Sequence, residues 1–143
     1  MIQKHKIALD VGDVRIGVAV SDLLGITANP RETYVRKKGD MNADIAYFCD
    51  YAKKEDADAF VLGFPKNMDG TEGDRAVVTR EFGDLLAEAS GLPVYYQDER
   101  LTTVSAERML IDADVRREKR KKVIDKVAAT IILQSYLDSH SRY

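Results

Sequence analysis

The spacing at which apolar residues recur, and the order in which strand-like and helix-like spacings follow one another, constrain the fold of this chain more than any other feature of the sequence. Ile7–Asp10 is a short apolar run that ends in an acid, and Val14–Ser21 alternates β-branched residues after a turn at residues 10–13. These two segments predict a pair of strands joined as a hairpin. A third strand is expected over residues 26–35, although Pro30 interrupts it. The first 35 residues therefore predict an antiparallel meander.

Beyond residue 40 the pattern alternates between the period of helices and that of strands. Gly91 follows the second helical pattern at a C′ position, and Thr103 is a candidate cap for the third. The expected helices cover residues 45–52, 78–89, 103–110 and 122–138, and the expected strands cover residues 59–64 and 94–97. The resulting order, β-β-β-α-β-α-β-α-α, predicts an α/β fold with a five-stranded mixed sheet, in which three antiparallel strands precede parallel ones and helices flank the sheet.

Length and residue usage limit the number of domains and the classes of protein to which the chain can belong. A chain of 143 residues is too short for two substantial lobes, so a single domain over residues 1–143 is expected. The single cysteine, Cys49, excludes an intramolecular disulfide and a cysteine-rich zinc site. No apolar run reaches the length of a membrane span and no targeting segment is visible, so we expect a cytoplasmic protein that does not enter membranes. The sequence is compatible with a monomer or a homodimer.

Three acids stand out by their context. Asp10 ends the first strand and Glu99 follows the fifth, where ligand sites of such sheets gather. Asp125 shares a face of the last helix with Ala128, Ala129, Ile132 and Tyr136. An acid on an apolar face is costly to bury unless it is paired, protonated or bound to a metal. If that helix packs near the ends of the first and fifth strands, the three carboxylates converge.

Converging carboxylates repel one another and require positive charge between them. Oxygen-only ligands select hard cations, so the predicted cofactor is Mg²⁺ or Mn²⁺, with two ions expected. Such a pair of ions suits phosphodiester hydrolysis. An ordinary structural role remains open, because a strand-end aspartate often forms a turn. Asp125 could also pair with a lysine of its own helix region, namely Lys121, Lys122 or Lys126.

Four segments of the chain resemble the motifs of the YqgF/RuvX family of small RuvC-like nucleases. They are LDVGDVRIGVAVSD (9–22), VLGFPKNMDGTEG (61–73), DERLTTVSAE (98–107) and IDKVAATIILQSYLD (124–138). The resemblance spans nearly the whole chain, with the motifs in the family's order. It implies a ribonuclease H-like fold and a metal-dependent nuclease that matures the 5′ end of precursor 16S rRNA. Resolution of Holliday junctions is the family's alternative activity.

The same resemblance implies that Asp10, Glu99 and Asp125 are the catalytic and metal-binding acids. Asp13 departs from the family pattern, which often has Thr or Ser after the glycine of the first motif. An additional acid at this place would either alter metal affinity or face solvent.

Arg15 and Arg100 are candidates for contacts with a substrate phosphate, and each has a surface ion pair as its alternative role. Lys66 and Asn67, in the loop after the fourth strand, are further candidates for contacts with substrate.

The end of the chain is basic, although the chain as a whole is slightly acidic. The formal net charge is −2, yet residues 113–143 carry eight Lys/Arg against four Asp/Glu. Such a run is either a solvated face or a clamp for a nucleic acid backbone, and its position before Asp125 favours the clamp. Its candidate substrate-binding residues are Arg116, Arg117, Lys119, Arg120, Lys121 and Lys122. The expected partner is a nucleic acid, with RNA favoured over branched DNA.

Two functions of other classes compete with the nuclease. The basic segment within an acidic chain also fits a non-catalytic RNA-binding assembly factor on a nuclease fold. The sequence Asp10-Val11-Gly12, followed by a hairpin, resembles the phosphate loop of actin-like and sugar-kinase ATPases. That class closes two related lobes over its nucleotide, and this chain supplies one lobe at most. The nuclease is therefore the function that the sequence favours.

Overall fold

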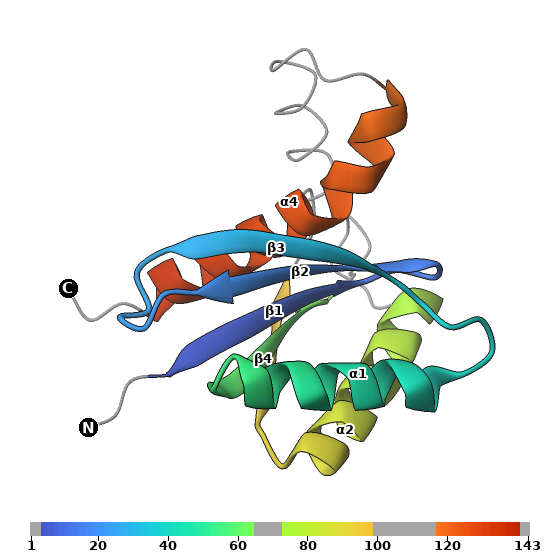
Figure 1. Ribbon diagram of the computed structural model, residues 1–143, viewed down its shortest axis with the longest axis horizontal. Helices are drawn as coiled ribbons and strands as arrows, with labels where there is room; N and C mark the ends of the chain where they lie inside the picture. The colour runs from blue at the N-terminus through green and yellow to red at the C-terminus, as the bar shows by residue number, and fades with distance from the viewer. Residues whose placement is uncertain (1–3, 65–72, 99–116, 141–143) are drawn as a thin grey trace.

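The computed structural model describes residues 4–64, 73–98 and 117–140 (Figure 1). Its five strands form one sheet in the order β3-β2-β1-β4-β5. They are β1 (His5–Val11), β2 (Arg15–Ser21), β3 (Ala28–Val35), β4 (Ala57–Phe64) and β5 (Val94–Asp98). Strands β1, β2 and β3 pair antiparallel, whereas β4 pairs parallel with both β1 and β5. The predicted fold class is therefore confirmed.

The proline in the third strand does not interrupt it. Pro30 lies inside β3, an edge strand, opposite Ala19 of β2. The register between β2 and β3 shifts beside this position, between Val18 and Ala19. A proline lacks the N–H that a ladder requires, and an edge strand with an irregular register tolerates that loss.

Two layers of helix cover the sheet. Helices α1 (Met41–Lys54) and α2 (Asp74–Ser90) lie on one face, and α4 (Arg117–Ser139) lies on the other (Figure 1). Asp40 caps α1 by accepting a hydrogen bond from the backbone N–H of Ala43, and Gly91 ends α2 in the left-handed conformation, as its position predicted. The third expected helix, over residues 103–110, lies outside the described residues. None of the described helices is long and apolar enough to cross a membrane.

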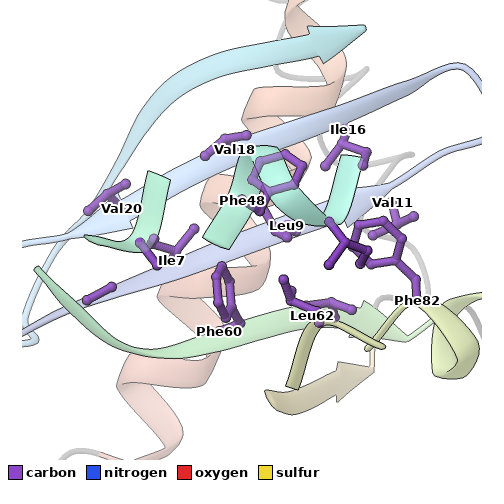
Figure 2. Packing of buried hydrophobic residues seen from close by; sticks show 14 residues of the cluster. Ile7, Leu9, Val11, Ile16, Val18, Val20, Phe48, Phe60, Leu62 and Phe82 are labelled. Atoms are coloured by element: carbon purple, nitrogen blue, oxygen red, sulfur yellow. The ribbon is translucent and has the colours of Figure 1, made fainter. Parts of the chain in front are cut away.

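The two sides of the sheet are packed with side chains of different size. The side that faces α1 and α2 carries large residues, among them Ile7, Leu9, Phe60 and Leu62, which meet Phe48 of α1 (Figure 2). The side that faces α4 carries small ones. Its buried cluster consists of Ala8, Ala19, Val61, Ala129, Ile132, Leu133, Tyr136 and Leu137. Ala8 and Ala19 of the sheet and Ala129 of α4 let the backbone of α4 come close to the sheet in this part of the helix.

Candidate functional site

Asp10 lies near the carboxyl end of β1, on the side of the sheet that α4 covers. Its neighbours Leu9 and Val11 belong to the large-residue core, whereas Ala8 belongs to the α4 cluster. Because side chains alternate along a strand, Asp10 faces the same way as Ala8. Asp10 is only partly buried, and its partner in the antiparallel register is Gly17 of β2.

Gly17 is also the point at which α4 meets the sheet. A Cβ added to Gly17 would stand 1.9 Å from the backbone oxygen of Asp125 and 2.8 Å from the backbone nitrogen of Lys126. No side chain fits between these two backbones. The glycine therefore lets α4 rest directly on β2, opposite Asp10. As a result, the structure brings Asp10 and Asp125 to the two sides of one residue, although 115 positions of sequence separate them.

Asp125 forms an ion pair with an arginine of the sheet. The Nε of Arg15 donates a hydrogen bond of 2.8 Å to Oδ2 of Asp125. Arg15 precedes Gly17 by two residues on β2, so both face α4. The side chain of Asp125 is 17% exposed and that of Arg15 is 40% exposed. Among the described side chains, this acid therefore pairs with a residue of β2, while the side chains of Lys121 and Lys122 lie outside the description.

The donor set fits a hard cation. Asp10 and Asp125 present carboxylate oxygens on the same side of the sheet, beside the carboxyl end of β1, and oxygen is the ligand that Mg²⁺ and Mn²⁺ prefer. Among the described residues, no group of three or more acidic, histidine or cysteine side chains forms a metal site. The third predicted ligand, Glu99, lies outside the described residues and directly follows the end of β5 in sequence.

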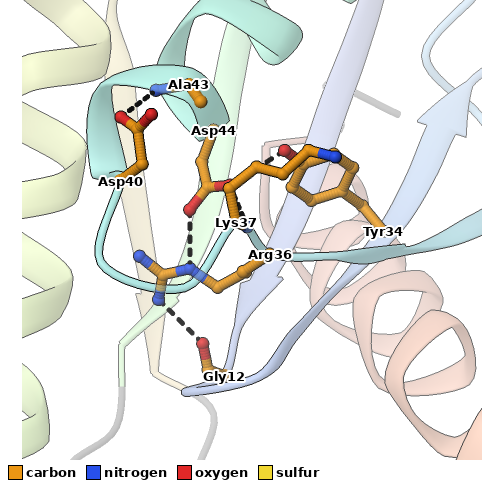
Figure 3. A network of polar contacts seen from close by, with 7 residues as sticks. All are labelled: Gly12, Tyr34, Arg36, Lys37, Asp40, Ala43 and Asp44. Atoms are coloured by element: carbon orange, nitrogen blue, oxygen red, sulfur yellow. Dashed lines mark hydrogen bonds and ion pairs between the residues drawn. The ribbon is translucent and has the colours of Figure 1, made fainter.

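The turn that follows Asp10 is held by two arginines that the sequence did not single out. Nη2 of Arg75 donates to the carbonyl of Val11 at 3.3 Å, and Nη1 of Arg36 donates to the carbonyl of Gly12 at 2.9 Å. Arg36 also donates through Nε to Asp44 at 2.9 Å (Figure 3). This arginine therefore ties the turn beside Asp10 to the first turn of α1.

Asp44 is fully buried at the centre of this network. Besides the hydrogen bond from Arg36, it accepts hydrogen bonds from the hydroxyl of Tyr34 at 2.8 Å and from the backbone N–H of Lys37 at 3.0 Å. Burial, followed by the hydrogen bond to this carboxylate, raises the pKa of Tyr34 to about 12. The sequence did contain a signal, because Asp44 precedes Phe48 by four residues on the apolar face of α1. The reasoning that singled out Asp125 applies equally to Asp44.

Replacement of Asp44 by asparagine is expected to destabilise the protein by about 2–3 kcal/mol, because Arg36 would keep its charge in a buried place without an anionic partner. The free energy of unfolding in urea measures this loss. Asp50→Asn is the matched control, since Asp50 lies on the same helix in an exposed pair with Lys54. We expect the control to cost less than about 0.5 kcal/mol. Equal losses in the two variants would contradict the role assigned to Asp44.

The remaining predicted residues are located only in part. Asp13 lies exposed in the turn between β1 and β2. Five residues of the basic segment belong to the first turns of α4, although their side chains are not described: Arg117, Lys119, Arg120, Lys121 and Lys122. Lys66, Asn67, Arg100 and Arg116 lie outside the described residues.

Comparison with known sequences finds one family along almost the whole chain. The sequence model of the RuvX family, described as a Holliday junction resolvase, matches residues 4–139. A protein of Halothermothrix orenii, named "Putative pre-16S rRNA nuclease", is 51% identical over 134 residues, which are 94% of each chain. A protein of Lactococcus lactis subsp. cremoris with the same name is 52% identical over 138 residues, again with 94% of each chain covered.

Comparison with solved structures finds the same architecture in more distant proteins. RuvC of Thermus thermophilus, solved in complex with a Holliday junction substrate, superposes with a TM-score of 0.60 at 12% identity, over 95% of this chain and 94% of RuvC. The Holliday junction resolvase of fowlpox virus gives a TM-score of 0.53 at 14% identity, over 94% of this chain and 99% of the viral one. At these identities the likeness extends to the fold alone.

Proposed function

The chain belongs to the RuvX family, and we propose from this premise that it is a metal-dependent nuclease that processes the 5′ end of precursor 16S rRNA. Nuclease activity agrees with the family and with the names of relatives that are half identical to this chain. One observation of the structure carries the proposal: Asp10 and Asp125 flank Gly17 on one side of the sheet. The RNA substrate comes from the names of the relatives. The proposed enzyme acts in the cytoplasm, with residues 1–143 as one nuclease domain.

We propose that Asp10, Glu99 and Asp125 hold Mg²⁺ or Mn²⁺, with two ions bound. Such ions, when bound, lower the pKa of a water molecule and stabilise the leaving oxygen of a phosphodiester. The contribution of the chain is to fix the carboxylates. Asp10 is fixed by the β1–β2 ladder, and Asp125 is fixed by the contact of its own backbone with Gly17. Arg36 and Arg75 hold the turn that follows Asp10.

The proposed contacts with substrate lie around this centre. Arg15 is at the site itself, and its planar guanidinium matches the geometry of a phosphate group. The basic segment leads into the helix that carries Asp125, where it would neutralise the backbone of the bound strand. The further residues proposed to contact substrate are Lys66, Asn67, Arg100, Arg116, Arg117, Lys119, Arg120, Lys121 and Lys122.

Cleavage of a branched DNA is the second candidate, because the family description names a Holliday junction resolvase. The two activities use the same chemistry on different shapes of nucleic acid. A non-catalytic assembly factor is the third, and it would bind RNA with a strong dependence on salt and without turnover. These three functions give different results in one set of incubations.

The test is incubation of the purified chain with an RNA that spans the 5′ end of 16S rRNA and, separately, with a four-way DNA junction. Each incubation contains Mg²⁺, Mn²⁺ or a chelator. We expect cleavage of the RNA with metal, no cleavage with chelator, and loss of cleavage in Asp125→Asn. Faster cleavage of the junction would favour the resolvase. Binding of RNA without cleavage under every condition would contradict the nuclease.

A further inference from the structure

We propose that Arg15 occupies the place of a cation on Asp125 while no metal is bound, and that a divalent ion must displace its guanidinium. The inference rests on the proposed function, since it concerns the same carboxylate. It assigns to Arg15 a positioning role that precedes any contact with substrate. Arg15 keeps Asp125 neutralised in the metal-free protein, opposes metal binding there, and is released toward the substrate phosphate once the metal arrives.

The geometry of the ion pair supports an exchange of this kind. Only Nε of Arg15 and only Oδ2 of Asp125 take part in the contact, at 2.8 Å. The terminal nitrogens of this guanidinium make no hydrogen bond to any residue that the structure describes. The side chain of Arg15 is 40% exposed, so it leaves Asp125 by rotating toward solvent. Neither β2 nor α4 has to move for this rotation.

Charge makes the two partners of Asp125 compete. The carboxylate is 17% exposed and lies against the backbone of β2, so leaving it unpaired is unfavourable. A guanidinium relieves that cost in the absence of metal. A divalent cation needs the lone pairs of the same oxygens, and it is repelled by a positive charge at 2.8 Å from one of them. Each partner therefore weakens the binding of the other by the same factor.

The exchange also links metal loading to binding of the nucleic acid. Once Asp125 is occupied by a metal, the released guanidinium no longer pairs with this carboxylate and lies beside the place where a phosphate would approach. Bidentate pairing with phosphate oxygens is then its favoured interaction. The whole guanidinium would be available to phosphate only in the metal-loaded protein, so a nucleic acid engaged before the metal would be held more weakly.

The chain contains a matched control for the removal of this charge. Arg31 of β3 pairs with Glu55 at 3.5 Å, and the two side chains are 42% and 24% exposed, close to the values for Arg15 and Asp125. Glu55 follows the carboxyl end of α1, on the opposite side of the sheet from α4. Arg31→Gln therefore removes one positive charge from a similar ion pair without changing the partner of Asp125.

Calorimetric titration with Mn²⁺, in the absence of nucleic acid, tests the proposal directly. We expect Arg15→Gln to bind Mn²⁺ about fivefold more tightly than the wild type, the factor that an ion pair of this exposure contributes. Arg31→Gln should bind as the wild type does. Equal or weaker binding by Arg15→Gln would overturn the exchange and leave the proposed nuclease standing. A wild type that binds no Mn²⁺ would overturn the exchange and the metal-dependent function together.

Thermal unfolding supplies a readout that does not depend on affinity alone. In chelator, Arg15→Gln should melt at a lower temperature than the wild type, because Asp125 has lost its partner. Saturating Mn²⁺ should remove this difference, since the ion stabilises the variant more. A difference that persists with Mn²⁺ would indicate an ordinary structural ion pair and would overturn the proposal. If Arg15→Gln does not fold, Arg15→Lys serves in both experiments. We expect Arg15→Lys to bind Mn²⁺ more tightly than the wild type, but by less than about fivefold.

Discussion

Replacement of Asp10 by asparagine is expected to lower the rate of RNA cleavage about a thousandfold while the fold stays intact. Asparagine has the same shape, so the pairing of β1 with β2 opposite Gly17 should be kept. It lacks the negative charge that holds a hard cation. A thousandfold loss corresponds to about 4 kcal/mol of transition-state stabilisation. Single-turnover cleavage of the precursor RNA, with thermal unfolding of the same sample, measures both parts of the expectation.

Asp13→Asn is the control for this experiment. Asp13 is three residues away, exposed in the following turn, and it loses the same charge on substitution. We expect it to cleave within about threefold of the wild type, because charges exposed to solvent are screened. Similar rates for Asp10→Asn and the wild type would exclude Asp10 as a metal ligand. A large loss in Asp13→Asn alone would move the site into the turn.

Replacement of Gly17 by alanine should destabilise the protein by more than about 3 kcal/mol, which makes it the largest structural effect that we expect. The added methyl group would stand 1.9 Å from the backbone oxygen of Asp125 and 2.2 Å from its carbonyl carbon. Two backbones cannot yield as a flexible side chain does, so α4 must move away from β2. The movement would also separate Asp125 from Arg15 and Asp10. The free energy of unfolding, measured in urea, and the cleavage rate should therefore both fall.

Gly39→Ala separates this steric effect from the general cost of losing a glycine. Gly39 has a φ of +73°, and a Cβ added there meets nothing within 4 Å. Its substitution should cost only the strain of a left-handed backbone, about 1–2 kcal/mol, and leave cleavage unchanged. If Gly17→Ala lost no more stability than Gly39→Ala, the close contact between α4 and β2 would be contradicted.

Most of the fold could be predicted because its signals are local. The strand and helix periods, the turn after Asp10 and the terminating Gly91 each depend on neighbours in sequence. The signal for the apolar face around Asp125 was also local, because it lies within one helix. The expected burial of that face is confirmed, since Ala128, Ala129 and Ile132 are at most 1% exposed. The proline of β3 was the exception. Its acceptance depends on β3 being an edge strand, which is a property of the sheet.

The partner of Asp125 could not be predicted, because a distant segment supplies it. Arg15 precedes Asp125 by 110 residues, and no sequence pattern around either residue predicts that the two will pair. Gly17 carried a usable signal, since a glycine inside a strand often marks the close approach of another backbone. The hydrogen bond from Arg36 to Gly12 left no signal in the sequence, because it depends on where the start of α1 meets the turn after β1. Packing, which places these segments together, decides the electrostatics of the site.

A crystal of the protein soaked in Mn²⁺, with anomalous scattering recorded to locate the metal, tests the proposed metal site most directly. We expect anomalous peaks within about 2.2 Å of carboxylate oxygens of Asp10, Glu99 and Asp125, with the guanidinium of Arg15 turned away from Asp125. Mn²⁺ bound elsewhere, or a carboxylate of Glu99 far from the other two, would contradict it.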